Sequence, residues 1–222
     1  TNPGTTDPVH PDCVAAAEHA ARLLEAAGHH VEVAHPEALD EPGRITAFIA
    51  IWGTLQAVAV DTWSTALGRG LGPDDVEPLT WQMVEQGRAT GASEYVQAVT
   101  AMQSWARRAQ QWWADGWDLL LTPTLGEPPP ELGVLQTPDE PLHGYARAGT
   151  FTPYTPAFNQ TGQPAISLPV HQSAEGLPVG VHLVAANGRE DRLIQVASQL
   201  EEAHRGPGAA RPCTRDLPMS VR

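Results

Sequence analysis

The chain has 222 residues, a mass of 23.7 kDa and a formal net charge of −13, from 26 acidic and 13 basic residues. All basic residues are arginine, so no lysine general base, Schiff base or P-loop lysine can come from this chain. Phosphate binding needs clustered cations, and the acidic balance therefore argues against nucleic acid and anionic membrane as partners.

The two cysteines, Cys13 and Cys213, lie near opposite ends of the sequence without CxxC spacing. They predict neither a disulfide framework nor a metal cluster, and we expect both to be reduced. The sequence does not open on a charged segment followed by an apolar signal region, and it has no run of 18 apolar residues. These features predict a soluble, cytoplasmic protein.

The first half of the chain predicts mainly helices. An alanine-rich amphipathic helix is expected over residues 11–27, ended by Gly28, and the alternation of residues 30–33 predicts a short strand. Residues 45–67 carry few charges and are apolar around most of a helical circumference, which predicts a long and largely buried helix. Another long helix is predicted over residues 93–115.

The second half predicts strands. Residues 117–124 read as a buried strand ended by proline, and residues 125–156 as a long loop rich in Pro, Gly and Thr. A loop of this length in a compact domain is usually functional, such as a lid or a pocket wall. Two apolar strands are predicted at residues 165–170 and 179–184, followed by a helix over residues 189–203.

The serines show no sign of a nucleophile that the chain could activate by itself. They are Ser64, Ser93, Ser104, Ser167, Ser173, Ser198 and Ser220, and none lies in a G-x-S-x-G or S-x-x-K motif. Ser167, inside a predicted strand, is interpreted as a hydrogen-bonded core residue. We therefore expect no catalytic residue among them.

Nine histidines raise the question of a metal site. His29, His30 and His35 are close in sequence, but no H-x-x-x-H or H-E-x-x-H pattern occurs. We interpret them as surface or helix-capping residues, because imidazolium is favoured at a helix C-terminus. His182 is predicted to point outward from a strand and to hydrogen-bond locally. We expect no metal site and no cofactor.

Four phrases occur in a recognisable order. They are the alanine-rich helix with GHHVE at residues 10–32, DLLLTPT at 118–124, FNQTGQPAISLP at 158–169, and GLPVGVHLV followed by GREDRLIQVASQLE at 176–201. Together they resemble the C-terminal half of the amidase signature family, over residues 9–203. Within that family, residues 36–77 are most similar to the nylon-oligomer and general amidase branch.

The resemblance implies an α/β fold, the C-terminal part of an α/β/α sandwich with a mixed twisted sheet. Residues 1–205 are expected to form the C-terminal half of an amidase domain, contributing sheet strands and part of the substrate wall. Residues 206–222 are expected to be a loose tail. The expected partner is the N-terminal catalytic half of the same protein.

The family hydrolyses amides by acyl transfer to water through a serine, a second serine on a cis peptide and a lysine. The resemblance places this triad before the first residue of the chain. The chain alone is therefore expected to be inactive toward a small-molecule amide substrate. We interpret the chain, which starts without Met, as a fragment of a full-length amidase.

Three residues are candidates for substrate binding. The resemblance implies that Trp52 lies beside the acyl-binding pocket, with core packing as the alternative. A loop that turns on Gly162 would place Phe158 and Asn159 at a cleft, unless the Asn159 amide fixes the loop by bonding its backbone. His182 stands where the family phrase often has glutamine.

Two other functions stay open. A stand-alone binding or structural module would expose a sheet edge and an apolar face, and would form a homodimer or aggregate. A subunit that needs a separate catalytic chain is the second. An amidotransferase subunit acting on charged tRNA is disfavoured by the acidic charge of the chain.

Overall fold

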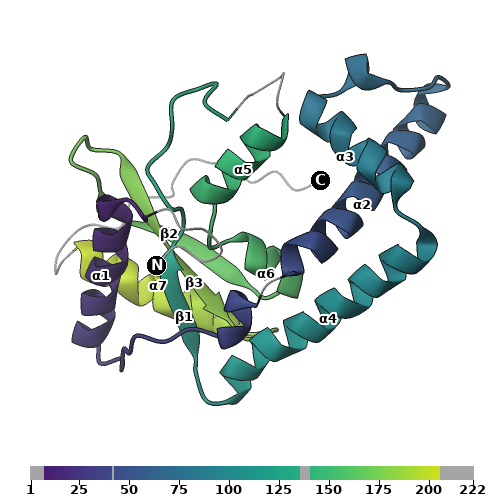
Figure 1. The fold of residues 1–222 in the computed structure, drawn as a ribbon. Coiled ribbons are helices and arrows are strands. Elements are labelled where there is room, and N and C mark those ends of the chain that lie inside the picture. Colours follow the sequence, from purple (N-terminus) through teal and green to yellow (C-terminus); the bar gives the residue numbers. More distant parts are fainter. Residues whose placement is uncertain (1–7, 42, 136–140, 206–222) are drawn as a thin grey trace, which may run out of the picture.

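The computed structural model describes residues 8–41, 43–135 and 141–205, and the predicted tail at residues 206–222 lies outside them (Figure 1). The elements in chain order are α1 Pro11–Ala26, η1 Glu37–Asp40, α2 Arg44–Leu67, η2 Pro73–Asp75, α3 Pro78–Ala89, α4 Ala92–Ala114, β1 Leu119–Pro123, α5 Pro141–Phe151, α6 Pro156–Thr161, β2 Ala165–Gln172, β3 Pro178–Ala185 and α7 Glu190–Arg205. Here η marks a short 3₁₀ helix.

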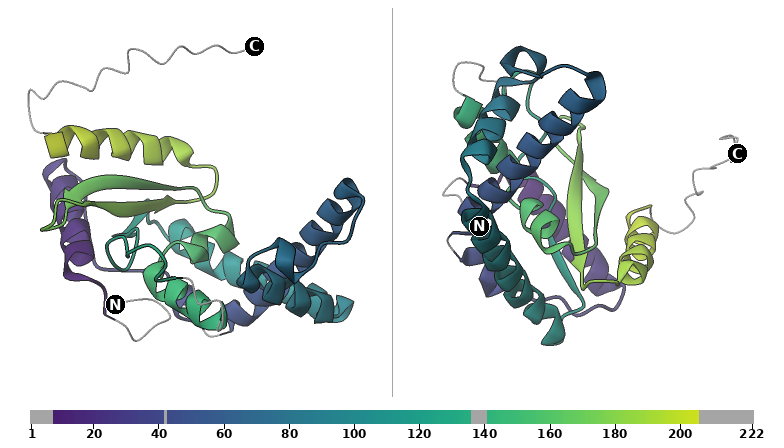
Figure 2. Two further views of the ribbon diagram at one scale, coloured as in Figure 1. Left: turned by 90° about the horizontal axis from the view of Figure 1, so that it is seen from above. Right: turned by 90° about the vertical axis from the view of Figure 1, so that its right-hand side faces the viewer.

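The sheet has three strands in the order β1-β3-β2, and both neighbouring pairs are antiparallel. Leu120 of β1 lies opposite Val184 of β3, and Ser167 of β2 lies opposite His182 of β3. Helix α7 covers one side of the sheet, and α4 and α6 lie on the other (Figure 2). The predicted α/β class is confirmed, as are the predicted strand pair and the four long helices.

Two apolar cores lie against the sheet. The first joins α1 and α7 to strand residues such as Val181 and Leu183, which are fully buried. The second joins Leu120 and Val184 to α4, α6 and η1. Successive strand residues point to opposite faces, so a strand covered on both sides needs an almost continuous apolar run. This explains why β3 carries few polar side chains.

Helices α2 and α3 and the first half of α4 extend away from the sheet as a helical arm (Figures 1 and 2). The prediction that residues 45–67 form a largely buried helix is wrong for burial, because only a stripe of small residues is buried. That stripe is Ala50, Gly53, Ala57 and Val60, whereas the exposed apolar side chains of α2 include Leu55, Val58, Trp63 and Leu67. By length and composition α2 could also cross a membrane, a test that core helices of soluble proteins pass as well.

Two further predictions are wrong. Residues 30–33 form no strand, because the segment has no neighbouring strand to bond and Val33 is fully exposed. Residues 125–156 are not one long loop, because helix α5 lies wholly within them. Gly144 and Gly149 lie within this helix, and glycine lowers helix propensity enough to hide the element in the sequence.

Candidate functional site

A cavity of about 160 Å³ lies where β1, η1, the first turn of α2 and α6 meet. Its walls include Leu39, Leu120, Ala157 and Phe158, with Arg44 and Tyr154 among the polar groups. Small-molecule sites are typically concave and mostly apolar, with a few polar groups that fix orientation. This cavity has that character, and it is the candidate site of the chain.

Phe158 forms the apolar floor of the cavity from α6. Pro156 begins this helix and Gly162, at φ +73°, ends it, so the predicted turn on glycine is confirmed although a short helix replaces the predicted loop. The Phe158 ring is 4% exposed and lies 5.6 Å, centroid to centroid, from the His182 ring. The buried packing fixes the orientation of the ring toward the cavity.

Asn159 follows Phe158 on the same helix but faces a different direction. Its side chain is exposed and does not line the cavity. Within the described part of the chain it forms no side-chain hydrogen bond, so the alternative of an amide that fixes the local backbone gains no support. Its role in substrate binding stays a prediction.

Trp52 lies in an aromatic stack that joins α2 to α5. Its ring is 5.7 Å from Phe48 and 5.8 Å from Tyr145, and both pairs are stacked. Trp52 is half-buried and does not line the cavity itself, although its helix supplies Arg44 to it. A binding role for Trp52 therefore also stays a prediction.

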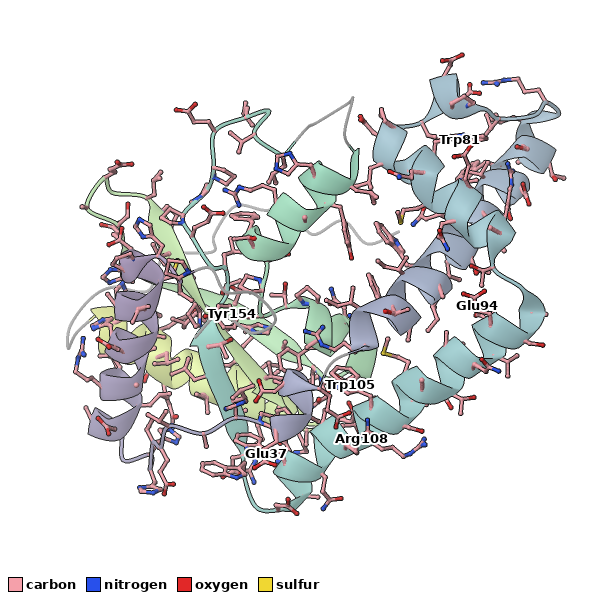
Figure 3. The ribbon with its side chains drawn as sticks, in the orientation of Figure 1. Glu37, Trp81, Glu94, Trp105, Arg108 and Tyr154 are labelled. Atoms are coloured by element: carbon pink, nitrogen blue, oxygen red, sulfur yellow. The ribbon has the colours of Figure 1, made fainter. Side chains whose placement is uncertain are left out.

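Arg44 is the half-buried cation of the cavity. It begins α2, and its guanidinium lies 5.7 Å from the centre of the Trp105 ring. Trp105 belongs to α4, and its Nε1 donates a 2.6 Å hydrogen bond to the Ala38 carbonyl, which ties η1 to α4 (Figure 3). Burial lowers the pKa of Arg44 from its usual value, yet an arginine stays protonated at neutral pH.

Tyr154, labelled in Figure 3, lines the cavity from the segment between α5 and α6. It is buried, and burial raises the pKa of its phenol to about 12, so the hydroxyl is neutral. His35 and Asp40 lie at the cavity too, joined by a 2.7 Å contact between His35 Nε2 and Asp40 Oδ2. The cavity therefore offers a cation, a neutral hydroxyl and a paired carboxylate.

The sequence interpretation missed Arg44 and Tyr154. A signal for Arg44 is present, because it and Asp61 are the two charged residues of a 24-residue apolar helix. A charge kept in such a helix needs a polar surrounding or a ligand. Tyr154 lies between α5 and α6, in a segment that the sequence predicts as loop. Its burial depends on packing between elements far apart in sequence, so no local pattern indicates it.

A polar row runs along the face of the sheet beside the cavity. Thr124 and Ser167 hydroxyls lie 2.7 Å apart, and Thr122 Oγ1 lies 3.4 Å from His182 Nδ1. The hydrogen bond predicted for Ser167 is present, but the residue is exposed rather than in the core. His182 is buried rather than outward-pointing, and burial lowers its pKa to about 4.

The described residues supply no activated nucleophile. No serine among them hydrogen-bonds a histidine, and no group of three His, Cys, Asp or Glu side chains there is arranged for a metal ion. Cys13 is a free thiol whose pKa burial raises to about 11, which makes it a poor nucleophile. Cys213 and Ser220 lie outside the described residues.

Comparison with known proteins gives consistent matches. The family model named Amidase matches residues 2–194. The chain is 39% identical over 208 residues to 6-aminohexanoate-cyclic-dimer hydrolase of Pseudomonas sp. (strain NK87), covering 91% of this chain and 42% of that protein. The similarity to the nylon-oligomer branch seen in residues 36–77 is thereby confirmed over most of the chain.

Solved structures agree. A structure of 6-aminohexanoate cyclic dimer hydrolase complexed with substrate matches with a TM-score of 0.85 at 38% identity, over 91% of this chain and 43% of that one. A bacterial aryl acylamidase of the amidase signature family matches in fold, with a TM-score of 0.65 at 19% identity, over 90% of this chain and 41% of that one. The chain thus spans less than half the length of these relatives.

Proposed function

The chain belongs to the amidase family, and on that premise we propose that it is the C-terminal portion of an enzyme that hydrolyses carboxamides. The observation that carries this proposal is the match over 91% of the chain, with the candidate cavity lying inside the matched region. The substrate is a small-molecule amide, and no cofactor or metal takes part.

We propose that the catalytic groups lie in a separate part of the protein. The relatives are more than twice as long as this chain, which lacks lysine. A serine, a cis-serine and a lysine outside the chain would carry out acyl transfer to water. The chain alone would then be inactive.

The role of this chain is to shape the acyl side of the site. Phe158 lines the cavity and contacts the substrate directly. Trp52 supports the wall through its stack on Tyr145, and the exposed Asn159 amide is available to a substrate group at the entrance. These three residues are the proposed binding set.

The exposed apolar side chains of α2 are a candidate surface for contact with another part of the protein or with a second copy. Large apolar patches on a protein surface mark interfaces more often than chance, and this face carries Leu55, Val58, Trp63 and Leu67. We propose that the catalytic half covers part of the chain and that a homodimer contact is available to the arm. A cytoplasmic location fits the buried free thiol of Cys13.

The test of the proposed activity is a substrate series. The protein as purified from its source is incubated with aliphatic primary carboxamides of increasing chain length, whose hydrolysis to the acid releases ammonia, and that ammonia is measured. The proposal predicts turnover that rises with chain length until the apolar cavity is filled. Absence of turnover on every carboxamide, by protein that is folded in circular dichroism, would refute it.

A further inference from the structure

Arg44 combines a half-buried side chain with a positive charge that has no carboxylate partner among the described residues, whereas Arg107, which also lacks one there, is exposed. Arginines that pair with a carboxylate within the described residues are Arg22, Arg69, Arg88, Arg108, Arg147, Arg189 and Arg192. Arg44 forms no such pair in that part of the chain, although it is half-buried. Burying a charge without a partner is costly, and such a group is stabilised when a ligand supplies the opposite charge.

The groups around Arg44 form no ion pair with it among the described residues. Tyr145 is the titratable group that influences it, and burial raises the pKa of that phenol, so it is neutral at pH 7. Asp40 lines the same cavity, but its Oδ2 is engaged 2.7 Å from His35 Nε2. Trp105 offers the face of its ring, which attracts a cation without neutralising it.

We propose that this cavity is a carboxylate-binding site, in which Arg44 binds the carboxylate of a ligand whose aliphatic chain lies on Leu39, Leu120 and Phe158. A guanidinium presents a planar fork of N–H donors that matches a carboxylate in two parallel hydrogen bonds. The source of the ligand rests on the proposed function, because hydrolysis of an amide converts the acyl group of the substrate into a carboxylate.

The volume of the cavity indicates the size of the ligand portion that this chain holds. A protein cavity of about 150 Å³ holds a benzene molecule, so a cavity of about 160 Å³ accepts roughly six to eight non-hydrogen atoms. Pentanoate, with five carbon and two oxygen atoms, fits this range. The ligand class is therefore a short aliphatic monocarboxylate, which is a product of hydrolysis or the charged end of a longer substrate.

The experiment compares two probes of one shape by isothermal titration calorimetry on the protein as purified from its source. Pentanoate carries the charge, and 2-hexanone replaces one carboxylate oxygen by a methyl group and cannot be hydrolysed. The proposal predicts that 2-hexanone binds at least about tenfold more weakly, and that added salt weakens pentanoate alone. Equal affinity, or no binding of pentanoate, overturns it.

Arg44→Met tests the residue, with Arg88→Met as its matched control. Arg88 also lies over a tryptophan ring, at 5.4 Å from the centre of Trp81, but it is paired with Asp61 away from the cavity. Pentanoate affinity should fall about tenfold in Arg44→Met and stay unchanged in Arg88→Met. Equal losses in both variants, or none in Arg44→Met, overturn the assignment.

Two further measurements separate possible failures. Should Arg44→Met not fold, Arg44→Lys keeps the charge but loses the fork, and it should bind pentanoate several-fold more weakly than the unsubstituted protein. The binding readout does not depend on turnover. Ammonia release without pentanoate binding would refute the carboxylate site alone, and pentanoate binding without ammonia release would refute the proposed activity alone.

Discussion

Gly87 of α3 lies so close to Gly53 of α2 that a Cβ added to Gly87 would stand 2.0 Å from the Gly53 carbonyl oxygen. The backbones of the two helices therefore touch at this crossing, and no side chain fits between them. The contact fixes how closely α2 and α3 approach each other, because the atoms that block a larger residue belong to the backbone and cannot rotate away.

Gly87→Ala is therefore expected to destabilise the protein. Overpacking of a closed contact typically costs about 1–3 kcal/mol, and here the obstructing atoms are backbone. Gly149→Ala in α5 is the control, because no atom lies within 4 Å of the added Cβ and helix propensity should improve stability by about 0.5–1 kcal/mol. Urea denaturation measures both, and a Gly87→Ala variant as stable as the unsubstituted protein would contradict the contact.

His182 gives the protein a stability that depends on pH. Its pKa is about 4 in the folded protein because of burial, against 6.5 as the usual value. Between these values the unfolded chain binds the proton and the folded chain does not, so the free energy of unfolding falls as the pH falls from 6.5 toward 4. The full loss is about 3 kcal/mol, from 1.36 kcal/mol per pH unit.

His182→Gln removes the titrating group and keeps a hydrogen-bonding side chain next to Thr122. We expect its free energy of unfolding to change less between pH 7 and pH 4 than that of the unsubstituted protein. His19, whose pKa is lowered by burial and by nearby histidines, contributes equally to both proteins and cancels. Parallel stability curves for the two proteins would show that His182 is not the source.

Local patterns predicted most of the elements but not their surroundings. The amphipathic period and Gly28 located α1, and the long apolar segment with few charges located α2, because each signal depends on residues adjacent in sequence. Burial of α2 could not be predicted in this way, because an apolar circumference does not tell which side meets a neighbour. Helix α5 was missed because Gly144 and Gly149 weaken its local signal.

The candidate site was predictable only in part. Phe158 was found through a family phrase, and the structure places it at the cavity. Arg44 and Tyr154 reach the same cavity from segments about 110 residues apart, a juxtaposition that no local pattern contains. The outward orientation predicted for His182 failed because α6 covers that face of the sheet, as its contact with Phe158 shows.

Trp52→Ala is expected to raise the KM for an aliphatic carboxamide about fivefold with little change in kcat, measured on the complete enzyme. The reason is the lost support of Tyr145, equivalent to about 1 kcal/mol of apolar contact. Trp112→Ala is the control, because Trp112 stacks on Trp117 at 4.7 Å and does not line the cavity. The same KM change in both variants would point to a general loss of packing.

The exposed face of α2 predicts self-association of the isolated chain. Val58 is 56% exposed and lies among other exposed apolar side chains of the arm, so a second copy can bury it. Light scattering after gel filtration should give a molecular mass that rises with protein concentration. The variant Val58→Glu should show a smaller rise in mass over the same concentrations. A monomer at all concentrations for the unsubstituted chain would contradict an interface on α2.

The central claim is that this chain shapes the substrate site while its catalytic groups lie elsewhere. The most direct measurement is ammonia release from one aliphatic carboxamide by residues 1–222 alone and by the complete protein, at equal molar concentration. The account predicts turnover by the complete protein and none by residues 1–222. Turnover by the purified residues 1–222 at a comparable rate would contradict it, because the nucleophile would then have to lie within this chain.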